Sequence, residues 1–576
     1  MFDIFAFKAA AVELQNSLPG EKVNRVFQPA PRDILISFNR PDKYNTLLIS
    51  ANPGNFRFHL TKEKFKQPLT PPPFCMLLRK HLQNSRILKV ESVDRERILK
   101  IDFALGTNRS FLICELMGRN SNIILVDGNN IIRGALKHIS PAMTRERLVS
   151  SGRDYTPPPS QRKISPSEAD LDTFSKIMLP AVNNEDNESP AKKLLRFFQG
   201  VGPMQAEEVV YRAEKQLSKN DVTGAVENMW ESYRELMDIY QNNQFRNFIV
   251  EKENGKKTYT VIDLELFRQN PKEAFQSTNT MLDTFYSKKV FEENRKQLKE
   301  KLNLLVKKEL KKVSLKERRQ QEDLKKAKKA DMYRIFGETI LANLGMIKGK
   351  NESITLPDIY NPGNNFLTIP LDPRYKAVDN AQIYFRKYRK LQTSKGKIKE
   401  RLPATRREIR YLESVLYSLE NAGMEELKEV RHELTEIGYI KVSRRKKEPK
   451  TTFRSKPMTL LTGSGYQVMV GQNNLQNDDI TFKIAGRNDI WFHIQKLPGA
   501  HVVVKGAPFP PDEQTLEEAA SLAAYFSKAG KTSVATVDYT LIKHVKRAPG
   551  KKPGMAIYKN FSTIHISPEK ALPLLK

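Results

Sequence analysis

The 576-residue chain contains only two cysteines, Cys75 and Cys114, and no apolar stretch approaches the length of a membrane span. Two cysteines cannot form a disulfide framework, and without a CxxC pair they offer no zinc site. A transmembrane helix needs roughly 20 mostly apolar residues, so we expect no membrane insertion. Residues 1–14 also lack a basic leader before their apolar patch, which disfavours a secretory signal. Together these absences predict a cytoplasmic protein.

The chain also lacks the short motifs that accompany common catalytic sites. It contains no GxxxxGKS/T, HExxH or GxSxG, and no GxGxxG follows a strand-like segment. Its eight histidines are scattered, without a cysteine or a second histidine at metal-ligand spacing. Asp478, Asp479 and Asp489 could serve as magnesium ligands, but acids beside Asn473 and Asn474 are more simply turn formers. We therefore expect a binding protein with no catalytic residue, metal or cofactor.

Acidic residues are scarce relative to basic ones, and the basic excess is concentrated. The chain has 97 Lys and Arg against 66 Asp and Glu, a net charge of +31. Residues 288–330 hold 17 basic and 7 acidic residues, and residues 374–401, 441–456 and 541–553 carry net charges of +8, +7 and +5. The basic segments lack the Trp, Phe and Leu face of an interfacial helix. This pattern favours nucleic acid as a partner over anionic lipid or merely solvated helix faces.

The central third of the chain carries two apolar stripes at heptad-like spacing. The outgoing stripe consists of Leu298, Leu302, Leu305, Leu310 and Val313. The returning stripe consists of Ile409, Leu412, Leu416, Leu419, Leu427, Val430, Leu434 and Ile437. Prolines between the stripes exclude a single helix there. We predict a long antiparallel coiled-coil arm over residues 285–440 with a small middle insert at about 345–380; an ordinary helical bundle is the alternative.

The segments on either side of the arm mix helical and strand-like patterns, so the fold class is α+β and multidomain. In the first block we expect an opening helix and strands at 33–38, 46–50, 98–103, 110–116 and 122–126. After a basic linker (441–456), the last block (457–576) has a predicted helix at 516–528. Its predicted strands lie at 467–470, 480–484, 490–493, 501–504, 533–538 and 563–566. The N-terminal domain is expected to comprise residues 1–178 and 226–284, interrupted by a small helical unit at 179–225.

The small helical unit contains the turn Gly200-Val201-Gly202 between two helical segments, with Pro203 opening the second. Two glycines permit a tight turn with positive φ, and proline suits the first position of a helix. Backbone N–H groups at such a turn can hold a phosphate oxygen. The unit resembles a helix-hairpin-helix module, although a GxG between helices is often only a connection. Glu207 and Glu208 argue for a light contact with phosphate.

Three polar features of the first block stand out from its apolar pattern. PPPFCMLLRKHL (residues 71–82) places Arg79 and Lys80 on a helix with an apolar opposite side. The pair Asp94–Arg95 lies between strand-like runs, and ELMGRNSNIIL (residues 115–125) ends a strand at a polar turn containing Arg119. Each could be a surface loop or a local ion pair, or all three could converge on one face.

These three motifs together resemble the N-terminal domain of the NFACT family. IPLDPRYKAVDNAQIYFRKYRKL (residues 369–391) is similar to the middle of its coiled-coil domain. DDITF (residues 478–482) and the following segments NDIWFH (488–493) and PGAH (498–501) are similar to its C-terminal NFACT-R domain. The resemblance covers nearly the whole chain in order, and it implies a glycosylase-like N-terminal fold. The glycosylase chemistry itself is not supported, because its nucleophilic proline is replaced by Phe2.

The resemblance also implies a function in ribosome-associated quality control. Such a protein would bind a large ribosomal subunit that carries stalled peptidyl-tRNA and recruit alanyl-tRNA. It would then promote template-free alanine tailing at the C-terminus of the stalled nascent chain, marking that chain for degradation. The ribosome itself would form the peptide bonds, so this protein would position tRNA and would not be an enzyme.

Carried over by position, Asp94 and Arg95 match the acidic-basic pair that the family needs to engage tRNA. An arginine can stack on an exposed base or bind phosphate, and an aspartate can accept from a base edge. The further candidates for the same tRNA-binding face are Arg79, Lys80, Glu115, Arg119 and Asn122. The family usually opens with Phe-Asp-Gly, whereas Phe2-Asp3 is followed here by Ile4, so no role is assigned to Asp3.

Two other functions fit part of the sequence. A fibronectin-binding surface adhesin would use the same positive charge to attract acidic matrix, but no LPxTG sorting motif is present. A DNA-processing role would rest on the hairpin unit alone.

Overall fold

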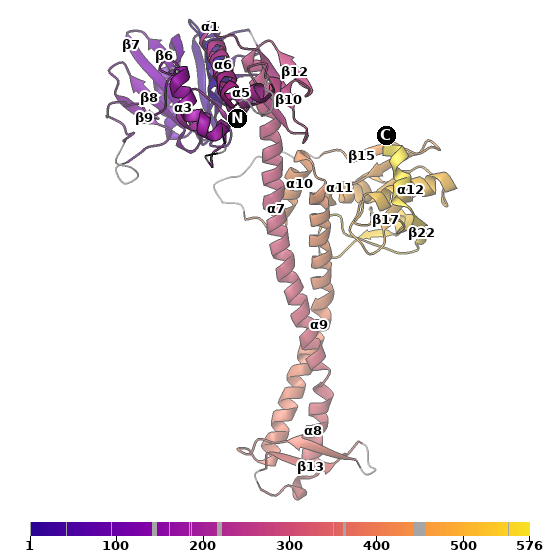
Figure 1. Cartoon of the computed structure of the whole chain (residues 1–576). Coiled ribbons are helices and arrows are strands. Elements are labelled where there is room, and N and C mark those ends of the chain that lie inside the picture. Colours follow the sequence, from indigo (N-terminus) through magenta and orange to yellow (C-terminus); the bar gives the residue numbers. More distant parts are fainter. Residues whose placement is uncertain are drawn as a thin grey trace. The chain divides into compact units, whose positions relative to one another are not determined.

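The computed structural model describes residues 2–41, 43–93, 95–140, 147–159, 162–183, 185, 187–215, 222–349, 351–360, 365–441, 455–530, 532–550 and 552–575. The chain divides into two compact units, Met1–Phe291 and Glu292–Lys576. Both units combine helices with antiparallel sheets (Figure 1), as the α+β class predicts. Within the described residues, no helix is long and apolar enough to cross a membrane.

The first unit contains two antiparallel meanders, in which every strand pairs with its neighbours in sequence. The four-stranded sheet is β1 (Val23–Ala30), β2 (Asp33–Phe38), β3 (Thr46–Ser50) and β4 (Arg57–Thr61). The five-stranded sheet is β5 (Arg86–Ser92), β6 (Ile98–Leu105), β7 (Asn108–Glu115), β8 (Asn122–Asp127) and β9 (Ile132–Ala135). Helix α1 (Ile4–Ser17) contacts β4 and β5, so the two sheets share one apolar core. Helix α2 (Pro73–Leu82) packs on β1, β6 and β9.

Four helices and a small sheet complete this unit. The helices are α3 (Leu171–Val182), α4 (Pro190–Phe197), α5 (Pro203–Lys215) and α6 (Val222–Gln241). The rings of Phe174, Phe198, Trp230 and Tyr233 form an aromatic group, in which Phe198 directly follows α4 and Trp230 is partly buried. The small sheet, in the order β11-β10-β12, consists of β10 (Asn247–Glu251), β11 (Lys257–Thr260) and β12 (Lys272–Phe275).

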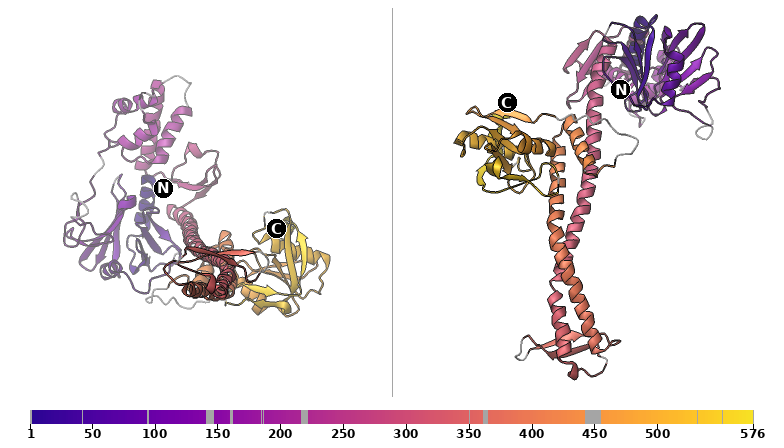
Figure 2. Two further views of the ribbon diagram at one scale, coloured as in Figure 1. Left: turned by 90° about the horizontal axis from the view of Figure 1, so that it is seen from below. Right: turned by 180° about the vertical axis from the view of Figure 1, so that it is seen from behind.

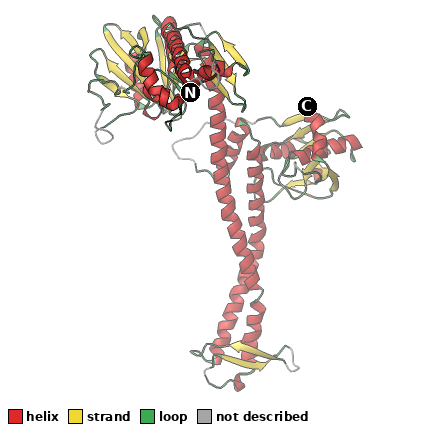
Figure 3. Ribbon diagram, in the orientation of Figure 1, coloured by secondary structure: helices red, strands yellow, loops and turns green. Residues whose placement is uncertain are grey.

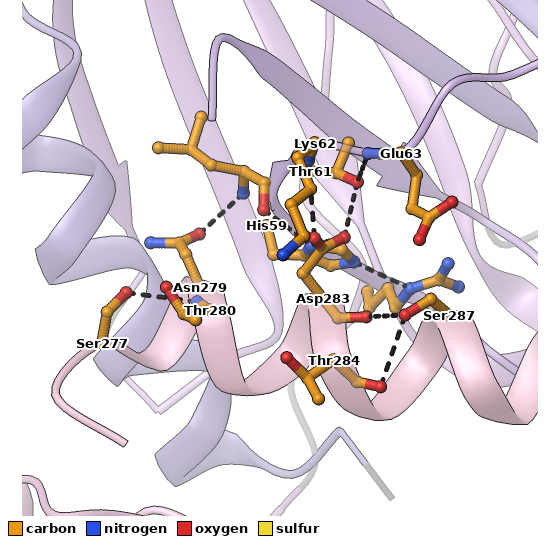
Figure 4. Close-up of polar contacts among 12 residues, drawn as sticks. His59, Thr61, Lys62, Glu63, Ser277, Asn279, Thr280, Asp283, Thr284 and Ser287 are labelled. Atoms are coloured by element: carbon orange, nitrogen blue, oxygen red, sulfur yellow. Dashed lines mark hydrogen bonds and ion pairs between the residues drawn. The ribbon is translucent and has the colours of Figure 1, made fainter. Parts of the chain in front are cut away.

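The first turns of helix α7 (Thr278–Ala327) are fastened to strand β4 by polar side chains (Figure 4). The amide of Leu60 donates to Asn279 Oδ1 at 2.8 Å, and the Thr61 hydroxyl donates to Asp283 Oδ1 at 2.5 Å. Asp283 is buried, and burial raises the pKa of its carboxyl. Because buried polar groups are costly unless they are paired, these bonds fix the register of α7 against the sheet.

In the second unit, α7 packs against the returning helix α9 (Ala377–Glu420), which runs beside it in the right-hand view of Figure 2. Leu302, Val306 and Val313 of α7 share one apolar cluster with Leu412 and Leu419 of α9. The predicted antiparallel arm is therefore present. The returning half of the arm consists of two helices, because residues 421–423 separate α9 from α10 (Met424–Glu436). Leu427, Val430 and Leu434 continue the cluster from α10.

The middle insert is a two-stranded hairpin between helices (Figure 3). Strands β13 (Ser353–Pro357) and β14 (Phe366–Pro370) pair in antiparallel register, with Thr355 opposite Thr368. They pack with α8 (Ala330–Ala342) and the start of α9 around Ile340, Leu356 and Ile369. The prolines at the strand ends thus terminate the hairpin, as proline at strand edges commonly does.

The C-terminal part of the second unit is built on an antiparallel sheet in the order β15-β16-β18-β17-β19-β22. The strands are β15 (Met458–Leu461), β16 (Gln467–Val470), β17 (Ile490–Ile494), β18 (Val502–Lys505), β19 (Ala535–Leu541) and β22 (Ser562–Ile566). Helix α12 (Glu513–Tyr525) buries its alanine-rich face on one side of the sheet. Trp491 centres a second cluster that includes Met469, Ile480, Val503 and Val545. A short hairpin of β20 (Val545–Arg547) and β21 (Ala556–Tyr558) adjoins this cluster.

Two predictions for this part were wrong. Residues 480–484 form a π-helical turn, not a strand, although Ile480, Phe482 and Ile484 alternate as in a strand. Only Ile480 of these three is buried, and Ile484 is 43% exposed, so the alternation does not mark one buried face. Asp478 and Asp479 are not turn formers either. They lie at the end of α11 (Asn474–Asp479), and Asn473 caps that helix by accepting from the Gln476 amide at 2.9 Å.

Candidate nucleic-acid pocket

The predicted hairpin of two helices is present, and its turn is shaped by glycine. Helix α4 ends at Phe197 and α5 begins at Pro203, while Gly200 adopts φ +80°. This is the left-handed region, which only glycine enters without strain. The Gln199 amide donates to the Ile164 carbonyl at 2.9 Å and so anchors the turn to the preceding chain.

The hairpin is also anchored to the beginning of the chain. Asp3 is buried; its Oδ1 caps α1 by accepting from the Ala6 amide at 2.9 Å, and its Oδ2 accepts from Gln205 Nε2 at 3.0 Å. A Cβ on Gly202 would stand 2.5 Å from Gln205 Oε1, so glycine lets the turn lie close to this side chain. The carboxylate that the sequence left without a role therefore joins α1 to α5.

Glu208, which argued for a light phosphate contact, faces inward instead. Its carboxylate is fully buried and accepts from Arg212 Nε at 2.5 Å. It also accepts from the backbone amides of Glu265 and Leu266 at 2.8 and 2.9 Å. Because its charge is compensated inside the unit, this residue does not oppose an anion at the Gly200 turn.

Arg95 lies directly against that turn. It is half-buried, with φ +53°, and its amide donates to the Tyr240 hydroxyl at 3.2 Å. A Cβ on Gly200 would stand only 3.5 Å from Arg95 Cδ, so the aliphatic stem runs along the glycine backbone. The guanidinium Nη1 is 3.4 Å from the Ser165 hydroxyl, to which it donates. Asp94, the other member of the predicted pair, lies outside the described residues.

Glu115, at the end of β7, lies in the same region, and two side chains donate hydrogen bonds to its carboxylate. Arg147 donates to both of its carboxylate oxygens, at 2.9 and 2.5 Å, and the Tyr155 hydroxyl donates at 3.0 Å. Burial, with the adjacent Glu115 charge second, raises the pKa of the Tyr155 hydroxyl, so this side chain stays protonated. Glu115 is thus an acceptor buried to 2% exposure, placed to hold Arg147 in the pocket wall.

Arg95, Glu115 and the Gly200 turn line one cavity of about 730 Å³ in the first unit. Its walls come from the N-terminus, the β5–β6 turn, the end of β7, the segment after β9 and the hairpin turn. Five cationic side chains line it: Arg95, Arg97, Lys137, Arg147 and Lys163. Three acidic side chains line it: Asp3, Glu96 and Glu115. A concave wall rich in cationic side chains is the chemistry that binds phosphate esters.

Burial lowers the pKa of both Arg97 and Lys163. For Arg97, the nearby charges of Asp3 and Glu96 oppose this shift, and Glu96 also opposes it for Lys163. The attraction between a partly desolvated cation and a bound anion is stronger than in water, because it is less screened. The cavity is therefore electrostatically suited to a phosphate of a nucleic acid.

The structure brings together Arg95, Glu115, Gly200, Val201 and Gly202, but not the other predicted residues. Arg79 lies in α2, where its Nε donates to the Val26 carbonyl at 2.8 Å, and Lys80 beside it is exposed. Arg119 is exposed in the short 3₁₀ turn Gly118–Asn120, one residue from the cavity. Asn122 is 1% exposed, and its amide bonds both backbone groups of Lys137 at 2.8 and 2.9 Å. That placement favours a structural role for Asn122.

Sequence reasoning missed Arg97, Lys137, Arg147 and Lys163, which supply four of the five cations. A signal existed for Arg97, which is two residues past Arg95. Lys137 and Arg147 lie in a segment without a recognisable pattern. Among the described residues, no group of three or more His, Cys, Asp or Glu side chains is placed to hold a metal ion.

The C-terminal basic segment also presents cations at a surface. Lys543, Lys546 and Arg547 are exposed, and Arg547 makes a double ion pair with Asp478 at 3.0 and 2.8 Å. The same guanidinium stacks over the Phe482 ring at 4.4 Å. Aspartates 478 and 479 are thereby used in ion pairs with Arg547 and Lys483.

Comparison with known proteins finds the NFACT family over nearly the whole chain. A family model described as NFACT N-terminal and middle domains matches residues 3–452, and one described as NFACT protein RNA binding domain matches residues 456–559. The chain is 34% identical over 567 residues to the Rqc2 homolog RqcH of Bacillus subtilis, covering 97% of this chain and 96% of that protein. It is 30% identical over 575 residues to the Rqc2 homolog RqcH of Streptococcus pneumoniae, covering 99% and 98%. A solved structure titled as the fibrinogen binding protein from Staphylococcus aureus is 28% identical, covers 50% of this chain and 98% of that chain, and superposes with a TM-score of 0.41.

Proposed function

The chain belongs to the NFACT family, and we propose that it is a ribosome-associated quality control factor. It binds large ribosomal subunits that carry stalled peptidyl-tRNA and recruits tRNA, with alanyl-tRNA as the expected species. It thereby promotes template-free alanine tailing of the stalled nascent chain for degradation. Curated relatives that match the chain end to end are named Rqc2 homologs, which supports this role.

The cationic cavity of the first unit is the observation that carries the tRNA-binding part of the proposal. It places Arg95 on the glycine turn of the hairpin, two features that lie more than a hundred residues apart in sequence. A guanidinium in the wall of such a cavity can engage a phosphate or stack on an adjacent base face. The predicted tRNA-binding residue Arg95 and the predicted phosphate-binding turn Gly200-Val201-Gly202 form this surface. Arg119 and Lys80 remain candidates for contacts outside it.

The arm and the C-terminal domain supply the contacts to ribosomal RNA. Arm residues 288–330 and 374–401 carry strong positive charge, and most of their lysines and arginines are exposed. A family model described as an RNA binding domain matches the C-terminal part, where Lys543 and Lys546 are exposed. Distributed cations of this kind bind RNA backbone without reading sequence.

In this proposal the protein performs no covalent chemistry. The peptidyl-transferase centre of the ribosome forms the peptide bonds, and the chain contributes by holding tRNA near it. Binding and orientation alone can accelerate a reaction strongly, because they convert an encounter of free reactants into a reaction within one complex. The role is that of a tRNA-positioning factor.

A tailing assay in a system with stalled nascent chains tests the proposal. Arg95→Ala should abolish alanine tailing while the protein still co-sediments with large subunits, since the arm and C-terminal contacts remain. Arg109→Ala, an exposed arginine of β7 outside the cavity, is the matched control and should tail normally. Normal tailing by Arg95→Ala would show that the cavity is not the tRNA site. Loss of tailing in both variants would show only a general charge effect.

A further inference from the structure

The backbone of Arg95 adopts a conformation that its residue type disfavours. Directly after Arg95, the Glu96 amide donates to the Val93 carbonyl at 3.1 Å. Its φ of +53° lies in the left-handed region, where glycine or asparagine is usual. Non-glycine residues in this region persist only where the surroundings hold them, and they concentrate at functional sites. The question is which group holds Arg95.

The hydroxyl of Tyr240 contacts this turn directly. It accepts the Arg95 amide at 3.2 Å from the last turn of α6, which is 145 residues further along the chain. This hydrogen bond joins the β5–β6 turn of the sheet to the helical unit that carries the hairpin. The bond restrains the Arg95 amide. The direction of this amide helps to set where the Arg95 side chain leaves the backbone.

The ring of Tyr240 is itself held rigidly. Tyr240 is 2% exposed, and its ring packs edge-on against Phe5 with centroids 5.2 Å apart. The ammonium of Lys8 lies 4.1 Å from the Tyr240 ring centroid, a cation–π contact. Both partners belong to α1, the helix that Asp3 caps. A fixed ring means that the hydroxyl position is set before any ligand arrives.

The far side of the Arg95 stem is bounded by Gly200. The stem passes 3.5–3.6 Å from the position that a Gly200 Cβ would occupy, and Met237 of α6 lies at 3.8 Å from the same point. The side chain is thus guided between α6 and the hairpin turn, with its guanidinium in the cavity wall. The Tyr240 hydroxyl restrains the Arg95 amide, and the backbone at Gly200 packs against the Arg95 stem. Together these two contacts define one direction for the side chain.

We propose that Tyr240 is a positioning residue for RNA binding, whose hydroxyl holds the Arg95 turn in its left-handed conformation and so aims the guanidinium at the phosphate bound on the Gly200 turn. The inference rests on the proposed function, because it assigns Tyr240 a role in the same cavity. Tyr240 lies outside the residues that line the cavity, so it acts only through Arg95. Pre-set orientation of a charged side chain raises affinity by removing the cost of ordering it on binding.

Tyr240→Phe in the full chain tests this, because it deletes the hydroxyl and keeps the ring that Phe5 and Lys8 contact. We expect tRNA binding to weaken about three- to tenfold, the effect of losing one orienting hydrogen bond. Amide hydrogen exchange in the peptide spanning residues 93–97 should accelerate, while exchange in α1 and α6 stays unchanged. Tyr211→Phe, which removes the hydroxyl of a 37% exposed tyrosine on α5, is the matched control and should bind tRNA normally.

A double-mutant cycle separates positioning from general stabilisation. In an Arg95→Ala background, Tyr240→Phe should cause no further loss of tRNA affinity. An equal loss in both backgrounds would mean that Tyr240 merely supports the fold, and unchanged affinity and exchange in Tyr240→Phe would also overturn the inference. If Arg95→Ala itself leaves tRNA affinity unchanged, the proposed function of the cavity fails independently of Tyr240.

Discussion

Glu433 is a buried acidic residue of the second unit whose carboxyl is strongly affected by its surroundings. It is 2% exposed on α10, and its Oε1 accepts from the Tyr411 hydroxyl at 2.7 Å and from Asn474 Nδ2 at 3.1 Å. Its Oε2 has no hydrogen-bond partner among the described residues. Burial raises the pKa of Glu433 to about 7; the two hydrogen bonds oppose the shift, and the charges of Asp478 and Glu429 add to it.

This shift predicts that contacts of α10 with α9 and α11 weaken as pH rises. The folded protein keeps the Glu433 proton to higher pH than the unfolded chain, whose carboxyl titrates near 4.5. The contribution of Glu433 to stability is therefore full below about pH 4.5 and is lost as pH rises to about 7, by about 3 kcal/mol at about 1.4 kcal/mol per pKa unit. Hydrogen exchange of α10 and α11, measured between pH 5 and 8 after correction for the intrinsic rate, checks this.

Two variants on α10 make that measurement specific. Glu433→Gln keeps an acceptor oxygen for Tyr411 and Asn474 but does not titrate, so the pH dependence should flatten. Glu436→Gln alters an exposed acid on the same helix and should leave the pH dependence as it is. A pH profile unaffected by Glu433→Gln would show that another group is responsible.

At the residue scale, the sequence identified the cavity only in part. Arg95 was predicted from its match to the acidic-basic pair of the family, and the Gly200 turn from its two glycines and the proline that follows them. Asp3 was set aside because its neighbour departs from the family pattern, yet its contacts are with Ala6 and with Gln205, which is 202 residues away. Such partners depend on tertiary packing, which no local pattern encodes.

At the element scale, the arm was predictable because its apolar stripe is long and periodic. Leu302 and Leu412, named from the heptad pattern, are both buried in the cluster between α7 and α9. The π-helical turn at 480–484 was not predictable, because three alternating apolar residues fit a strand equally well. The hairpin of β13 and β14 was recognised only as a break in the helix, since prolines exclude a helix without specifying what replaces it.

The packing of the arm predicts a sharp contrast between two leucines. Leu412 is fully buried, so Leu412→Ala should destabilise the arm by about 2–5 kcal/mol through lost burial and a cavity. Leu304 lies in α7 but is 71% exposed, so Leu304→Ala should change stability by at most about 0.5 kcal/mol. Hydrogen exchange of peptides within residues 298–313 and 409–419 measures both. Equal effects would contradict the described α7–α9 packing.

At the scale of the whole molecule, the net charge of +31 predicts binding that depends strongly on salt. Each phosphate contact contributes about −0.7 to −0.9 to the slope of log affinity against log salt concentration. Replacing the exposed arm lysines Lys307, Lys308 and Lys311 by glutamine should therefore make the slope for large-subunit binding less negative by about 2–3.

A charge-matched control distinguishes a bound arm from a general attraction. Replacing Lys252, Lys256 and Lys257 around the β10–β11 turn by glutamine removes the same charge from the first unit. This variant should keep the original slope. If both triple variants change the slope equally, overall charge rather than the arm determines binding.

Sequencing the RNA that co-purifies with the protein tests the central claim most directly. We predict enrichment of tRNA and of large-subunit ribosomal RNA over small-subunit RNA, with alanine tRNA foremost among the tRNAs. With Arg95→Ala, the tRNA should be lost while the ribosomal RNA remains. Recovery of no ribosomal RNA or tRNA above background, even at low salt, would contradict the proposed function.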